Sequence, residues 1–256
     1  MKNRSFLVPI VAALTYVLMV TINALANILP IAGMNTGAVS DAYPNLFAPA
    51  GLTFSIWGLI YLLLAIHTIF QFSAKDQLPL RKRIGLIFSL SSVANALWIF
   101  TWHYQYIALS VVLMLVILIS LILINRLTSA QKLGTAFYWT VRLPFSVYFG
   151  WITVATIANI TTFLVDLGWS GTPFSESFWT SLVLVVGLII GLSWGLPTND
   201  KAYLFTLIWA FLGILIKHTS VFASAYLSVL ITVSLCLVAL VYAIVLTYRV
   251  GNVHEN

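Results

Sequence analysis

The sequence predicts an all-α protein, a polytopic bundle of about eight transmembrane helices, and three observations lead to this fold class. Only 7% of the 256 residues are charged and 61% are hydrophobic, whereas a soluble domain carries charge on about a quarter of its positions. The apolar runs are continuous, about twenty residues long, and lack the period-two alternation of a β-barrel strand. The basic residues fall between these runs, mostly on one side of the predicted membrane.

Eight apolar runs are long enough to cross the hydrocarbon layer of a bilayer. We expect helices at about residues 6–30, 52–73, 85–104, 106–125, 137–166, 178–196, 202–217 and 224–248. Glycine and proline mark the connections between them, as at Gly33, Gly37 and Pro44 after the first run and Pro197 after the sixth. The seventh run is the shortest of the eight.

The positions of the cations predict the orientation of the chain. If the N-terminus is cytoplasmic, only Lys217 of the twelve lysines and arginines falls outside. The other eleven are Lys2, Arg4, Lys75, Arg81, Lys82, Arg83, Arg126, Lys132, Arg142, Lys201 and Arg249. This bias satisfies the positive-inside rule, so we expect both termini in the cytoplasm, in a bacterial cell membrane. The net charge of +6 then needs no nucleic-acid partner.

The N-terminal run has an alternative interpretation as a cleavable signal peptide. Lys2 and Arg4, an apolar stretch and the small triplet from Ala24 to Ala26 resemble such a segment. The stretch is long for a signal peptide, and it contains Asn23 and Asn27. A retained first helix is therefore the preferred interpretation.

Amide and aromatic side chains recur at helical spacing in four of the predicted spans, from the midplane outward. These stripes are Asn23 and Asn27 in the first span, Phe54, Trp57 and Tyr61 in the second, Asn95, Trp98 and Trp102 in the third, and Trp151, Ala155 and Asn159 in the fifth. A carboxamide in hydrocarbon needs a partner, so the asparagines should face the bundle. Aromatic rings add flat apolar area, and the stripes together predict a cavity for a flat hydrophobic ligand. The alternatives are interhelical hydrogen bonds and an interfacial aromatic belt.

The first loop, from Ile31 to Gly51, is long and rich in turn-forming residues. Its one charged residue is Asp41, and it contains the apolar side chains of Tyr43, Leu46 and Phe47. Such a loop favours a lid over the outer end of the bundle, with Asp41, Tyr43 and Phe47 as lid residues. The alternative is an ordinary connection with a short interfacial helix that Ser40 would cap.

The sequence lacks the motifs of ordinary enzymes. No zinc-protease, nucleophile-elbow or P-loop pattern is present, and no carboxylates cluster inside the spans. The single cysteine, Cys236, excludes an intramolecular disulfide. We therefore predict no catalytic residue, no metal site and no cofactor. A proton-coupled secondary transporter that uses His67 or Asp166, and a slow tetrapyrrole-modifying enzyme, remain alternatives to simple ligand binding.

Three passages resemble the TspO family, the tryptophan-rich sensory or translocator (peripheral benzodiazepine receptor) proteins. They are the stretch from Pro49 to Tyr61 that contains Trp57, the N-x-x-W pattern of Asn95 and Trp98, and the stretch from Trp151 through Ala155 to Asn159. They follow one another in the order and helices expected for that family. The resemblance covers about residues 6–165, and the last three helices have no counterpart in its five-helix bundle.

The resemblance implies a five-helix bundle over residues 1–166, followed by a three-helix extension over residues 167–256. It implies a pocket beneath the first loop that binds porphyrins, sterols or synthetic benzodiazepine-type ligands, in a bundle that often dimerises. It places Trp57, Tyr61, Asn95, Trp98, Trp151, Ala155 and Asn159 at that pocket. Roles in tetrapyrrole transport or sensing follow from the same resemblance.

Overall fold

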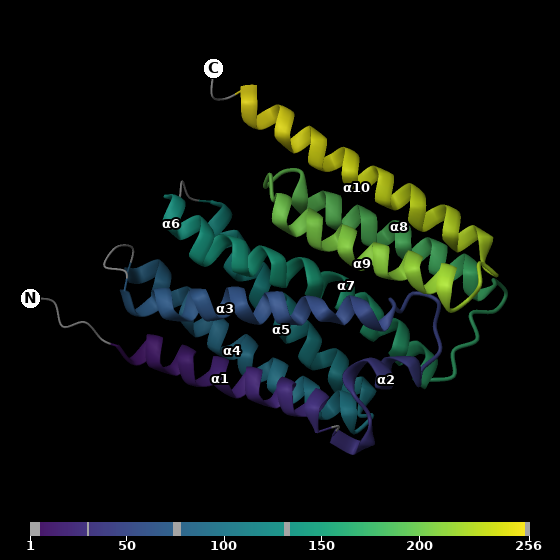
Figure 1. The fold of residues 1–256 in the computed structure, drawn as a ribbon, viewed down its shortest axis with the longest axis horizontal. Helices are drawn as coiled ribbons and strands as arrows, with labels where there is room; N and C mark the ends of the chain where they lie inside the picture. The colour runs from purple at the N-terminus through teal and green to yellow at the C-terminus, as the bar shows by residue number, and fades with distance from the viewer. Residues whose placement is uncertain (1–5, 30, 74–77, 131–133, 254–256) are drawn as a thin grey trace, which may run out of the picture. The chain divides into compact units, whose positions relative to one another are not determined.

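The structure is a computed structural model that describes residues 6–29, 31–73, 78–130 and 134–253. In this part of the chain every regular element is a helix (Figure 1). The long helices are α1 (Leu7–Ile28), α3 (Ile56–Ser73), α4 (Leu78–His103), α5 (Ile107–Ser129), α7 (Leu143–Asp166), α8 (Glu176–Gly195), α9 (Lys201–Ser220) and α10 (Leu227–Val253). The short elements are η1 (Ile31–Gly33), α2 (Thr36–Asp41), η2 (Gly51–Ser55), α6 (Thr135–Phe137) and the π-helical turn η3 (Tyr138–Arg142).

Eight helices among the described residues are long and apolar enough to cross a membrane, so the predicted all-α, multi-pass fold is confirmed. The predicted third span begins too late, because α4 already starts at Leu78. Its early charged residue Arg81 is buried, and its guanidinium donates hydrogen bonds to the carbonyls of Phe70 and Gln71 at 2.9 and 2.5 Å. Four of the predicted cytoplasmic cations, Lys2, Arg4, Lys75 and Lys132, lie outside the described residues, as does the side chain of Arg249.

The chain divides into two compact units, and each is described by itself. The first unit comprises residues through Val39 together with Ile56–Phe149, and the second comprises Ser40–Ser55 and the chain from Gly150 onward. The boundary inside the fifth span therefore falls between Phe149 and Gly150. The division into domains at residue 166 stays a prediction.

In both units apolar side chains are exposed and small polar side chains are buried, as expected for a protein that lies in lipid. Leucine, isoleucine and valine side chains are exposed on the long helices, for example Leu14, Leu62 and Val238. Small polar side chains are buried instead, on α4 most clearly, where Ser91, Ser92 and Asn95 have no exposed surface. Apolar side chains can face the lipid directly, so their burial does not drive the helices together. Packing and hydrogen bonds between small and polar residues hold the helices together instead.

In the second unit a glycine stripe on α8 lets α9 approach closely. Gly187, Gly191 and Gly195 recur every fourth residue and are buried. A methyl group on Gly195 would lie 2.5 Å from the Leu204 side chain, and one on Gly191 would overlap Leu207. This small-xxx-small pattern is a common interface between membrane helices. The glycines therefore allow the close packing of α8 against α9.

Candidate functional site

Three helices of the first unit meet at a buried chain of polar side chains. Asn23 of α1 donates its amide to Asn95 Oδ1 of α4 at 2.7 Å, and Asn95 Nδ2 donates to the Tyr148 hydroxyl of α7 at 3.0 Å. All three residues are buried. Asn27 does not join them, because it is exposed near the end of α1 and its amide bonds to the Asn23 carbonyl.

Aromatic rings lie beside these hydrogen-bonded side chains. The Trp57 ring stacks on Tyr61, with ring centroids 5.4 Å apart, and meets the Tyr148 ring edge-on at 5.9 Å. Trp57 and Tyr61 are only partly buried as residues. The Tyr61 hydroxyl oxygen itself is buried, and it has no hydrogen-bond partner among the described residues. A buried hydroxyl without a hydrogen-bond partner lowers the free energy of unfolding by about 1–3 kcal/mol.

Trp98 and Trp102 form a second aromatic pair on α4 that holds the first half of the loop. Their rings stack at 5.4 Å, and Trp102 Nε1 donates to the Thr36 carbonyl at 3.2 Å. Next to them, His103 Nδ1 lies 3.1 Å from the Ile31 carbonyl and Nε2 lies 3.2 Å from Thr36 Oγ1. A carbonyl only accepts, so Nδ1 donates to the Ile31 carbonyl.

The short helix in the first loop exists, but the prediction that Ser40 would cap its start is wrong. Helix α2 runs from Thr36 to Asp41, so Ser40 lies at its end. Asn35 begins the helix instead, because its Oδ1 accepts the Ala38 backbone N–H at 2.8 Å. Asparagine is as good an N-cap as serine.

The second unit holds the remaining predicted site residues. Phe54 meets Trp151 edge-on, with ring centroids 5.7 Å apart. Trp151 and Asn159 are buried, and Ala155 between them is partly exposed. The structure therefore pairs Phe54 with Trp151, and it distributes the predicted ligand-binding residues over both units. Whether they join in one pocket stays a prediction.

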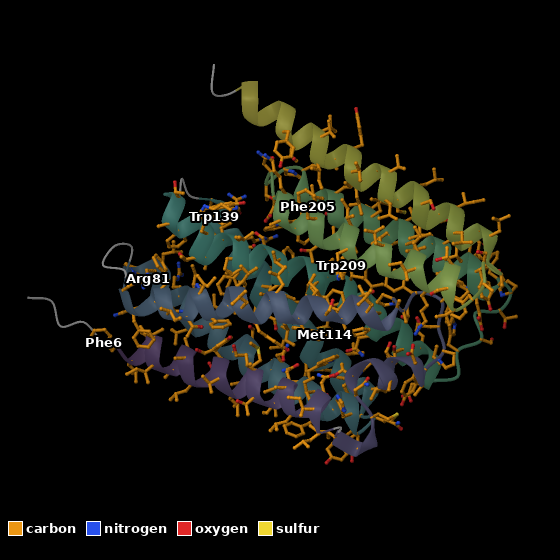
Figure 2. The ribbon with its side chains drawn as sticks, in the orientation of Figure 1. Phe6, Arg81, Met114, Trp139, Phe205 and Trp209 are labelled. Carbon is orange, nitrogen blue, oxygen red and sulfur yellow. The ribbon has the colours of Figure 1, made fainter. Side chains whose placement is uncertain are left out.

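The second half of the first loop, Ser40–Ser55, is fastened along α9. Asp41 forms an ion pair with Lys217 at 2.8 Å, and His218 Nε2 lies 2.8 Å from the Leu46 carbonyl. Two further hydrogen bonds follow along the loop. The Ala50 N–H donates to the Gly213 carbonyl at 3.0 Å, and Trp209 Nε1 donates to the Thr53 carbonyl at 2.9 Å (Figure 2). The Lys217 side chain is 10% exposed and that of Asp41 is 60% exposed. One of the C-terminal helices thus anchors the predicted lid residue Asp41.

Phe47, another predicted lid residue, is buried and lines a cavity of about 340 Å³ within the second unit. Tyr43 lies nearby in the chain, outside the membrane-spanning helices. Burial first, and then the negative charge of Asp166, raise the pKa of its hydroxyl. Tyr43 is therefore an uncharged hydrogen-bonding group at neutral pH.

His67 of α3 is held between two helices of the first unit. Pro144 has no N–H with which to bond the Thr140 carbonyl four residues earlier, and the chain forms a π-helical turn just before it. His67 Nδ1 lies 3.0 Å from the Thr140 carbonyl and donates to it, because a carbonyl only accepts. Nε2 then accepts from the Gln71 amide at 2.8 Å. Both ring nitrogens have partners, as an interhelical histidine requires.

The sequence patterns did not predict the role of Tyr148 or the cavity of the second unit. Tyr148 lies three residues before Trp151, so the stripe of the fifth span could have been extended backward to include it. The cavity could not have been found in this way. Its lining comes from two loops and two helices, and no sequence spacing relates them.

Comparison with models of known protein families gives a match over most of the chain. The family model described as TSPO-like protein matches residues 9–247. Comparison with curated proteins and with solved structures finds no match. The family prediction is confirmed, and the matched span extends beyond residue 165 to include α8, α9 and most of α10. The three-helix extension therefore has a counterpart in this family model, and the chain belongs to the TSPO-like protein family.

Proposed function

We propose that this integral membrane protein binds a flat hydrophobic small molecule of the porphyrin or sterol class. The proposed site is the aromatic and amide cluster of the first unit, which consists of Trp57, Tyr61, Asn95, Trp98 and Tyr148. The observation that carries the proposal is the buried Tyr61 hydroxyl without a partner, beside the half-buried ring of Trp57. An unsatisfied polar atom next to accessible aromatic surface is what an amphipathic ring ligand would complete.

Each residue has a distinct role in this proposal. The Trp57 ring stacks on the flat ligand, and Trp98 forms a wall on α4. The Tyr61 hydroxyl supplies a polar contact, and Asn95 keeps Tyr148 oriented through its 3.0 Å hydrogen bond. Phe54, Trp151, Ala155 and Asn159 belong to the second unit, and their contribution to ligand binding remains a prediction.

Titration with protoporphyrin IX tests this site. We expect saturable quenching of tryptophan fluorescence in the wild type, and loss of the saturable phase in a Trp57→Ala, Trp98→Ala double variant. The control is Trp139→Ala, because Trp139, which Figure 2 labels, is 57% exposed and is not one of the cluster residues. It should bind as the wild type does.

A milder variant covers the case in which the double variant does not fold. Tyr61→Phe keeps the ring and removes only the hydroxyl, so we expect affinity to fall about twofold to tenfold, the value of one hydrogen bond. Saturable binding that is unchanged in both the double variant and Tyr61→Phe would remove the assignment.

We also propose that both termini lie in the cytoplasm of a bacterial cell, because the cations of the sequence are so unevenly distributed. The native cysteine is buried, so introduced cysteines can report the topology. A membrane-impermeant maleimide added to intact spheroplasts should label Ser170→Cys, in the loop after α7, and leave Ala130→Cys, in the loop after α5, unlabelled until the cells are broken. The reverse pattern would invert the orientation.

A further inference from the structure

The cavity of the second unit shares no lining residue with the cluster proposed for porphyrin or sterol. Its volume of about 340 Å³ falls within the range of about 300–1,000 Å³ found for small-molecule sites. Its walls come from the end of α7, the loop after α7, the start of α8 and the second half of the first loop. The lining includes Phe47, Leu164, Trp169, Glu176, Trp179 and Val186.

Hydrogen bonds hold these walls in place. Asn45 Oδ1 accepts the Ala48 N–H at 2.9 Å and so shapes the turn that carries Phe47. Trp179 Nε1 donates to the Gly171 carbonyl at 2.7 Å. Gly171 has a φ of +71°, and a side chain there would lie 2.8 Å from the Trp179 ring. Only glycine allows the loop to approach the indole so closely.

The cavity lining carries negative charge only. Glu176 is the only charged residue among the lining residues, and its exposed carboxylate has no ion-pair partner in the part of the chain that the structure describes. The remaining lining is mostly apolar, with two indoles, Trp169 and Trp179, whose ring centroids lie 5.0 Å apart. A carboxylate next to indole rings attracts a cation, because the ring faces carry negative charge.

We propose that this cavity binds an apolar molecule that carries one ammonium group. The apolar body occupies the space among Phe47, Leu164 and Val183, and the ammonium group lies at the rim, near Glu176 and the two indoles. The same charge opposes an anionic ligand, so the cavity disfavours the two carboxylates of protoporphyrin. This site goes beyond the function proposed above and does not depend on it.

Two fluorescent probes of matched shape test the charge preference. Dansylcadaverine ends in an ammonium group, and N-dansyl-6-aminohexanoate ends in a carboxylate on a similar tether. With protein in dodecyl maltoside, an uncharged detergent, we expect saturable binding of the first and binding of the second at least about threefold to tenfold weaker, a difference that salt should reduce. In Glu176→Gln the two affinities should become nearly equal.

A filling variant tests the location. Val186 lines the cavity, whereas its neighbour Val185 does not, although their side chains are similarly exposed at 44% and 40%. Val186→Phe should weaken dansylcadaverine about tenfold or more, and Val185→Phe should bind as the wild type does. No saturable binding to the wild type, equal binding of the two probes, or full binding by Val186→Phe would each overturn the proposal.

Protoporphyrin titration separates this proposal from the first. Glu176→Gln and Val186→Phe should leave the saturable tryptophan quenching by protoporphyrin intact, because neither residue belongs to the first unit. Loss of that quenching in both variants would contradict two independent sites, whereas loss in the Trp57→Ala, Trp98→Ala variant alone would support them.

Discussion

Replacing Asn95 with alanine is expected to lower the free energy of unfolding by about 1–3 kcal/mol. The change removes two interhelical hydrogen bonds, one from Asn23 and one to Tyr148, and such bonds contribute about 0.6–1.7 kcal/mol each in membrane proteins. No water can replace them in hydrocarbon, so the Tyr148 hydroxyl would lose its donor. The measurement is unfolding in mixed micelles with increasing sodium dodecyl sulfate.

Ser92→Ala provides the matched control. Ser92 lies on the same helix, is equally buried, and its hydroxyl has no partner among the described residues. Removing an unpaired hydroxyl removes no hydrogen bond, so the free energy of unfolding should stay within about 0.5 kcal/mol of the wild type or rise. Equal destabilisation by the two substitutions would show that Asn95 contributes only its volume.

Replacing Gly213 with alanine is expected to destabilise the second unit by about 1–3 kcal/mol, the usual cost of an overpacked contact. A methyl group there would lie 2.6 Å from Thr53 Cγ2 and 2.8 Å from Thr53 Cβ. The Gly213 carbonyl also accepts the Ala50 N–H at 3.0 Å. Segment Ser40–Ser55 must therefore move away from α9, and proteolytic cleavage within it should become faster.

Gly58→Ala is the control for this second substitution. A methyl group on Gly58 would meet no heavy atom within 4 Å, so alanine should only improve the helix propensity of α3, by up to about 0.5–1 kcal/mol. Protease sensitivity of Ser40–Ser55 should not change. If Gly213→Ala behaved like Gly58→Ala, the close contact between η2 and α9 would be of no importance for stability.

The helices could be predicted from the sequence because the membrane imposes a local rule. A span must be long, apolar and helical, since every backbone group needs a partner within its own segment. The predicted seventh span, 202–217, lies inside α9, even though it was the shortest run. The predicted start of α4 was too late because a charged residue, Arg81, lies in its first turns. The Arg81 guanidinium donates hydrogen bonds to two backbone carbonyls, and hydropathy cannot reveal such partners.

Spacing also placed Asn23, Asn95 and Asn159 on buried faces, where the structure has them. It failed for Asn27, which shares a face with Asn23 yet is exposed. A helical period gives the direction of a side chain but not where the neighbouring helix ends. Tyr148 was missed for a related reason, since its importance depends on Asn95, a residue from another helix.

The sequence by itself determined the membrane environment, the eight spans and the family, because these depend on composition, run length and local motifs. Only the tertiary structure decided that α9 fastens the first loop, that Asn95 bridges α1 and α7, and that one cavity opens beside Phe47 and Glu176. Those features join residues that are distant in the chain. Their partners are selected by close packing and by the need to satisfy polar groups in hydrocarbon.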